Sequence, residues 1–102
     1  MNLKNNCYED IKFINFTPSK EMIQFISFKL QEIERKSPSD ACLHLKIIKE
    51  KIGWIAKFEL QSRNLKFNCI HKSIHEACVL DDLFLDLLER LDKWAKIKHI
   101  YF

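Results

Sequence analysis

The sequence predicts one α+β domain in which two helices cover one face of a four-stranded sheet, in the order β-α-β-β-β-α. A chain of 102 residues fits a single domain, and an apolar content of 47% is enough for one core. Three consecutive segments within residues 41–70 alternate apolar and polar residues with the period of a strand. Two longer segments, 20–36 and 74–99, repeat apolar residues every three and four positions, as amphipathic helices do.

The first third of the chain predicts one strand and one helix. Residues 1–10 carry no pattern and are expected to be a loose lead-in. The segment IKFINF (11–16) is rich in β-forming residues and is the first predicted strand. Thr17 or Ser19 can cap the helix that follows, and Ser37-Pro38-Ser39-Asp40 ends it. The expected buried stripe of this helix consists of Met22, Phe25, Ile26, Leu30 and Ile33.

Three predicted strands follow, joined by short turns. ACLHLKIIK (41–49), GWIAKFELQ (53–61) and LKFNCI (65–70) each place most of their apolar residues on one face. This alternation predicts an antiparallel meander with one covered face. The opposite face is expected to be uncovered, basic and partly apolar, with Glu59 as its only acid, and is therefore a candidate binding surface. Its predicted members are His44, Lys46, Ile48, Ile55, Lys57, Lys66, Asn68 and Ile70.

The last predicted helix, residues 74–99, is the longest periodic segment. Ser73 is expected to cap it, with Glu76 completing a capping box. Acidic residues dominate its first two-thirds and basic residues its end, which the helix dipole favours and which is a first indication of an anionic partner. The basic residues are Lys93, Lys96, Lys98 and His99. The expected buried stripe is Cys78, Leu80, Leu83, Phe84, Leu87, Leu88, Leu91, Trp94 and Ala95.

Composition narrows the classes of function. The net charge of +3 permits a nucleic-acid partner without requiring one. The start of the chain shows no secretory signal, and no apolar run is long enough to cross a bilayer, so we expect a cytoplasmic protein with reduced cysteines, three of the four buried. With one glycine and no nucleophile or phosphate-loop motif, the chain predicts no enzyme activity, no cofactor and no small-molecule substrate.

Two constellations have alternative interpretations. Cys69, His71, His75 and Cys78 offer four potential zinc ligands within ten residues, but their spacing matches no standard zinc pattern. Both cysteines are expected on buried faces and both histidines on the surface, so no metal is expected. Trp94 keeps the helical spacing of a core residue, whereas its lysine neighbours also suit stacking on a base.

Three segments carry a resemblance to a known family. KEMIQFISFKLQEIER, NLKFNCIHKSIHEACVLDDL and DLLERLDKWAK resemble the first helix, the last strand with the start of the second helix, and the basic helix end of the ribosome hibernation promoting factors. That family includes the ribosome-associated inhibitor proteins. The similarity runs from about Ile11 to Lys98, and the chain is similar to a divergent, short-form member.

The resemblance implies a translation inhibitor that lodges in the mRNA and tRNA channel of the small ribosomal subunit and stabilises idle ribosomes. It implies a non-enzymatic rRNA binder that is a monomer or weak dimer when free. An alternative is a divergent paralogue that acts as a protein-interaction module without binding ribosomes. A double-stranded-RNA-binding domain is a third possibility, although that domain has no strand before its first helix. The rRNA contacts implied are Lys29, Arg35, Lys36, Arg90, Lys93, Lys96 and Lys98.

Overall fold

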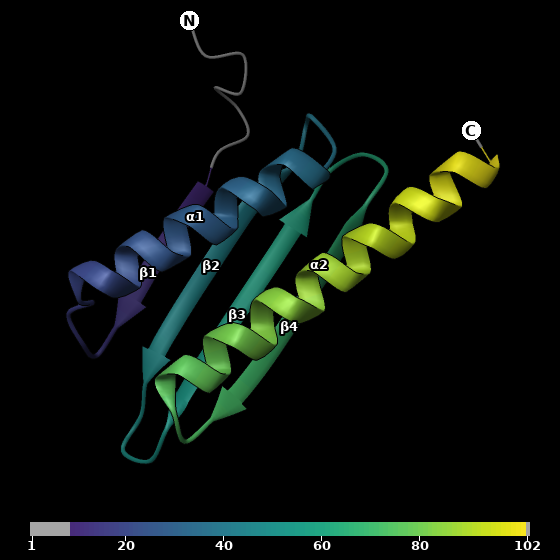
Figure 1. The fold of residues 1–102 in the computed structure, drawn as a ribbon. Coiled ribbons are helices and arrows are strands. Elements are labelled where there is room, and N and C mark those ends of the chain that lie inside the picture. The colour runs from purple at the N-terminus through teal and green to yellow at the C-terminus, as the bar shows by residue number, and fades with distance from the viewer. Residues whose placement is uncertain (1–8, 102) are drawn as a thin grey trace, which may run out of the picture.

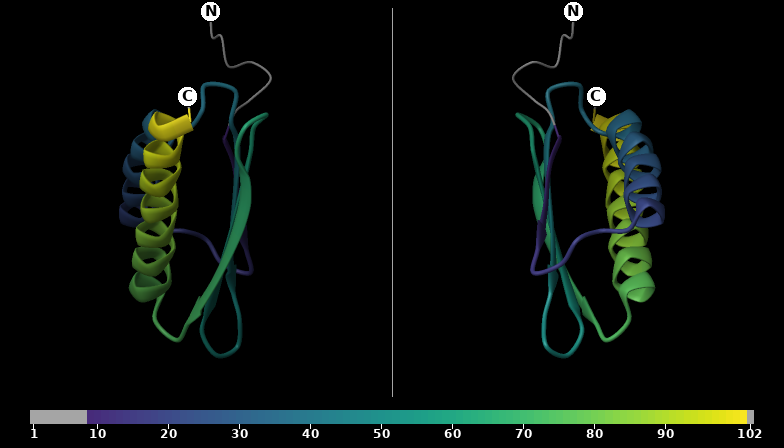
Figure 2. Two further views of the ribbon diagram at one scale, coloured as in Figure 1. Left: turned by 90° about the vertical axis from the view of Figure 1, so that its right-hand side faces the viewer. Right: turned by 90° about the vertical axis from the view of Figure 1, so that its left-hand side faces the viewer.

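A four-stranded sheet and two helices form two layers. The computed structural model describes residues 9–101, and the side chains of residues 10–97. The order β-α-β-β-β-α is confirmed, and the sheet has the strand order β1-β2-β3-β4, with β1 parallel to β2 and the other pairs antiparallel. Both helices cover the same face and run side by side toward the same end of the molecule (Figures 1 and 2). The elements are β1 (Glu9–Ile14), α1 (Lys20–Lys36), β2 (Cys42–Lys49), β3 (Trp54–Gln61), β4 (Lys66–Ser73) and α2 (Glu76–Tyr101).

Strand β1 begins and ends two residues earlier than predicted. It ends because Asn15 has a φ of 70°, a left-handed conformation that asparagine adopts more readily than most residues. The Asn15 side-chain amide donates to the Lys49 carbonyl at 3.3 Å. Phe16, predicted to lie in the strand, packs edge-on against Trp54 with ring centroids 4.9 Å apart. The earlier start makes Asp10 part of the sheet rather than of a lead-in.

Helix α1 follows its predicted pattern closely. Ser19, rather than Thr17, is the N-cap, and its hydroxyl accepts from the Met22 amide at 3.1 Å. The predicted stripe is buried except for Phe25, which is half-buried. Phe25 lies at the junction of the two helices, where its ring meets that of Phe84 edge-on at 5.9 Å between centroids. This contact helps to hold α1 beside α2.

The predicted capping box at the start of α2 is wrong. Ser73 is the last residue of β4, paired with Trp54, and its hydroxyl accepts from the His75 amide at 3.2 Å instead of capping the helix. The helix begins at Glu76. β4 extends this far because Gly53, in the turn before β3, allows the strands to approach. A Cβ at Gly53 would lie 2.6 Å from the Ser73 carbonyl oxygen, and the residue has a φ of +99°.

The core between sheet and helices contains most of the predicted apolar faces, but the predicted stripe of α2 is only partly right, because Leu88, Trp94 and Ala95 are half-buried. Cys78 is exposed, whereas its neighbour Val79 is fully buried. Of the three cysteines described, only Cys69 is buried and Cys42 is half-buried, so the expectation of three buried cysteines is wrong. The buried core consists of Met22, Ile26, Leu30, Ile33, Leu43, Leu45, Ile47, Ala56, Phe58, Leu60, Cys69, Val79, Leu80, Leu83, Phe84, Leu87 and Leu91.

Candidate nucleic-acid interface

The carboxyl ends of both helices lie at one end of the molecule (Figure 1). Lys36, the last residue of α1, places its Nζ 3.1 Å from the Asp92 carboxylate of α2. Arg35 precedes it and is exposed, and Lys96 follows Asp92 by one turn on the same side of α2. Each helix leaves a partial negative charge at this end, which favours the cations. The fold therefore brings together basic residues about sixty positions apart in sequence.

Helix α2 is longer than the sheet that it covers. Its 26 residues span about 39 Å, whereas the eight residues of β4 span about 26 Å. The last turns of α2 therefore project past the edge of the sheet (Figure 1). Lys93 and Lys96 are both exposed on this part of the helix. Lys98 lies farther along α2, outside the described side chains.

Arg90 is held in place by a network between α2 and β4. Its Nε donates to Asp86 at 2.9 Å, and its guanidinium lies 5.6 Å from the centre of the Phe67 ring. The other Asp86 carboxylate oxygen lies 2.8 Å from Nε2 of His71. The buried thiol of Cys69, on β4, adjoins Asp86. Arg90 is still 46% exposed, so it is both fixed and accessible.

The network determines the charge state of its members. Burial would raise the pKa of the Asp86 carboxyl, but the hydrogen bonds from His71 and Arg90 outweigh it and lower that pKa below its usual value. Burial, and then the negative charge of Asp86, raise the pKa of the Cys69 thiol to about 11. Asp86 is therefore ionised and Cys69 is a neutral thiol near pH 7. A neutral thiol is a poor nucleophile, so Cys69 is unreactive near pH 7, and the Asp86 carboxylate of α2 contacts His71 of β4 and Arg90.

A groove of about 500 Å³ runs between β4 and α2 beside this network. Trp94 lines it and is half-buried, so it is neither a full core residue nor an exposed stacking platform. Arg90 and Lys93 lie at the same groove, beside the apolar surface of Leu65 and Ile97. The groove thus combines cations with apolar surface at the basic end of the molecule.

Lys29 is separate from the other predicted contacts. It lies seven residues before Lys36, about 10 Å along the helix axis, and is half-buried with its ammonium 5.8 Å from the centre of the Phe25 ring. The structure therefore brings Lys36 and Lys96 to one side of the helix ends, and Arg90 and Lys93 to the other, while Arg35 is exposed in the last turn of α1.

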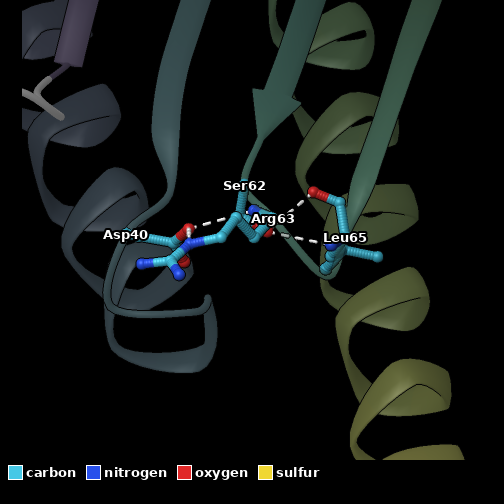
Figure 3. A network of polar contacts seen from close by, with 4 residues as sticks. All are labelled: Asp40, Ser62, Arg63 and Leu65. Carbon is cyan, nitrogen blue, oxygen red and sulfur yellow. Dashed lines mark hydrogen bonds and ion pairs between the residues drawn. The ribbon is translucent and has the colours of Figure 1, made fainter.

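Arg63, a further basic residue at this end, was not predicted as a contact from the sequence. Arg63 lies in the turn between β3 and β4, and its side chain is 91% exposed. Figure 3 shows that Asp40, just after α1, accepts from the Arg63 amide at 2.9 Å, and its carboxylate lies 3.8 Å from the Arg63 Nε. Within the turn, the Ser62 hydroxyl donates to the Leu65 carbonyl and accepts from the Leu65 amide, and the Ser62 amide also donates to that carbonyl, each at 2.9 Å. The fixed turn presents Arg63 next to the end of α1, which no helical pattern could reveal.

The potential zinc ligands do not form one group. Cys69 is buried beneath α2, whereas Cys78 is exposed on the outside of that helix. His71, expected on the surface, instead lies half-buried against Asp86. Among the described side chains, no three of the types His, Cys, Asp and Glu are placed to hold a metal ion.

Two solved structures resemble this arrangement over most of the chain. A ribosomal subunit interface protein from Coxiella burnetii matches with a TM-score of 0.67 and 14% sequence identity, covering 87% of this chain and 98% of its own. The N-terminal domain of Thermus thermophilus Protein Y matches with a TM-score of 0.67 and 11% identity, covering 83% of this chain and 98% of its own. This chain has their fold.

Comparison of the sequence itself with known families and proteins found no relative. No protein-family model and no curated protein matches the chain. At 11–14% identity, the structural similarity shows the fold that the hibernation-factor resemblance predicts. A strand precedes the first helix, unlike in a double-stranded-RNA-binding domain. Within residues 9–101, neither helix has an apolar stretch of the length that a bilayer requires.

Proposed function

We propose that this protein is a ribosome-associated translation inhibitor. It binds rRNA of the small subunit in the channel for mRNA and tRNA, and so stabilises idle ribosomes. The observation that carries the proposal is the shared fold, over nearly the whole chain, with a protein described as a ribosomal subunit interface protein. The gathering of exposed cations at the helix ends supplies the chemistry that an rRNA partner needs.

Binding of this kind is occupancy rather than catalysis. Arg90, Lys93 and Lys96, with Arg35 and Lys36, meet phosphates of the rRNA backbone from the overhanging end of α2 and the end of α1. Arg90 is suited to this role because Asp86 engages its Nε and leaves the rest of the guanidinium free for bidentate contact. Six acidic residues precede the lysines of α2, so only the last turns of that helix face phosphate.

Co-sedimentation tests the proposal. Purified protein is centrifuged with bacterial 30S subunits, 50S subunits and 70S ribosomes at about 50 mM and about 200 mM salt. Because neutralised phosphates release counterions, we expect binding to 30S and 70S particles at the lower salt and release at the higher. Absence from the 30S pellet at the lower salt refutes the proposal and favours a protein-interaction module instead.

A pair of matched variants tests the contact surface. Reversing two charges with Lys93→Glu and Lys96→Glu should abolish co-sedimentation at about 50 mM salt and relieve inhibition of cell-free translation. The control reverses Lys20 and Lys51, which are exposed at the opposite end of the molecule, and should bind like the unmodified protein. Equal loss in both variants would remove the helix ends as the contact surface.

A further inference from the structure

The face of the sheet turned away from the helices carries a row of lysines. Register places Lys12 beside Lys46, and Lys46 directly opposite Lys57, so the three lie in line across β1, β2 and β3. Neighbouring strands are about 4.8 Å apart, so the row spans about 10 Å at the backbone. No described element covers this face (Figure 2). Ile70 of β4 ends the row.

These lysines have no compensating partners among the residues that the structure describes. The two acids of the face have partners other than these lysines. Asp10 lies 3.5 Å from Nδ1 of His44, and Glu59 accepts from the side-chain amide of Gln61 at 2.8 Å. None of the three lysines forms an ion pair with a described residue. Like charges directly opposite on paired strands are destabilising. The fold thus maintains an arrangement that weakens it.

The open face holds the excess positive charge of the chain. Five of the 17 lysine and arginine residues lie on it, and two of the 14 aspartate and glutamate residues, which gives a net +3 with histidine neutral. The whole chain also has a net charge of +3, so the basic and acidic residues outside this face are equal in number. Asp10 corrects the expectation that Glu59 is the only acid here. The five basic residues are Lys12, Lys46, Lys57, Lys66 and Lys72.

A shallow cavity of about 440 Å³ lies over the row. All three lysines line it, together with His44 and Asn68, which can donate further hydrogen bonds, and with the two acids of the face, Asp10 and Glu59. Lys46, at its centre, is half-buried, so its ammonium has less freedom than an ordinary surface lysine. Among the described residues that line the cavity, Phe58 is the only aromatic one, and it is buried in the core, so the cavity offers no platform for stacking bases.

We infer that the open sheet face is a second RNA-binding surface, in which the row of Lys12, Lys46 and Lys57 holds the phosphate backbone of an RNA duplex. The lack of a platform for stacking bases favours backbone recognition over base recognition. The spread of lysines across the whole sheet favours a polymer over a small anion. The inference rests on the proposed function only in taking RNA as the partner, and it places an RNA contact on the face opposite the helices.

Fluorescence anisotropy with a labelled RNA duplex of about 16 base pairs tests this inference on the full chain. The variant Lys46→Gln with Lys57→Gln should bind the duplex at least tenfold more weakly at about 50 mM salt. The slope of log affinity against log salt should become shallower by about two. The matched control, Lys20→Gln with Lys51→Gln, removes the same charge at exposed positions elsewhere and should change neither value.

Thermal unfolding provides a second readout. Because the substitution relieves repulsion between opposite lysines, the sheet variant should melt at a higher temperature than the unmodified protein when RNA is absent. Lys46→Arg with Lys57→Arg keeps the charge and should retain duplex binding, which separates loss of contact from loss of fold. Unchanged duplex affinity in the glutamine variant, or equal weakening in the control, overturns the inference.

The two proposals can fail separately. If the protein does not sediment with 30S subunits but its duplex binding depends on Lys46 and Lys57, the proposed function is wrong and the inference stands. If it sediments with 30S subunits and its duplex affinity does not depend on these lysines, the inference alone is wrong. If the unmodified protein does not bind the duplex at about 50 mM salt, the inference is also overturned.

Discussion

Replacing Asp86 by asparagine should destabilise the protein measurably, because one carboxylate connects α2 to β4. It accepts from Arg90 at 2.9 Å and lies 2.8 Å from Nε2 of His71. Hydrogen bonds to a charged group contribute about 1.5–3 kcal/mol each when buried. The Asp86 side chain is 27% exposed and that of Arg90 is 46% exposed, so solvent reduces these values. We expect a total loss of about 1.5 kcal/mol, which lowers Tm by roughly 6–12 °C in a domain of this size.

The loss should depend on pH in a defined direction. The folded state lowers the pKa of Asp86, so ionised Asp86 stabilises the fold above the usual carboxyl pKa. That contribution disappears as pH falls through the lowered folded-state pKa. Urea unfolding of both proteins at a series of pH values should therefore show a constant difference near neutrality that narrows below about pH 4.

An exposed acid on the same helix provides the control for this experiment. Asp82→Asn should change the free energy of unfolding by less than about 0.5 kcal/mol. If Asp86→Asn is equally mild, or if its difference from the unmodified protein is as large at pH 3 as at pH 7, the network does not stabilise the fold as described.

Three further predictions concern single features. At pH 8, iodoacetamide should alkylate exposed Cys78 well before buried Cys69, whose thiol has a pKa of about 11. Peptide mapping by mass spectrometry measures both alkylation rates, and equal rates would contradict the described burial of Cys69. Gly53→Ala should lower the free energy of unfolding by about 1–3 kcal/mol because of its positive φ and close backbone approach; urea unfolding tests this, and a neutral effect would show that the turn relaxes. In a double-mutant cycle, Lys36 and Asp92 should couple by less than about 1 kcal/mol and lose this coupling at high salt, whereas a larger, salt-independent value would indicate a buried pair.

The fold could be predicted because its two layers repeat simple periods. Leu43, Leu45 and Ile47 alternate without exception, and a one-residue slip would expose all of them. Where the pattern is weak, the observed ends of the strands differ from the predicted ones. His71, Lys72 and Ser73 carry no apolar signal, so only the pairing of β4 with β3 shows that the strand continues through them.

It is equally difficult to predict which residue begins the buried stripe of a helix. Cys78 and Val79 are adjacent and both apolar, and either can begin a stripe that continues through Leu83. The structure decides in favour of Val79, which lies one turn before Leu83 and is fully buried. A free cysteine is often buried, which made the wrong choice plausible from residue type alone.

The candidate surfaces were only partly visible in the sequence. The basic end of α2 follows from one segment, but its neighbour Arg63 belongs to a turn whose position depends on Asp40. The lysine row requires the register of three strands, including the parallel pairing of Lys12 with Lys46. Neither turn length nor alternation specifies that pairing, so the row became apparent only with the sheet assembled.

The sorted charges of α2 have a consequence for the rate of encounter. Acidic side chains over the first two-thirds of this helix and basic side chains at its end give it a lasting electric dipole along its length. These whole charges exceed the opposing half charges of the helix backbone. Near a polyanion such a dipole orients the molecule before contact, with the overhang of α2 leading. Association should then be fast at low ionic strength and slow steeply as counterions screen the field.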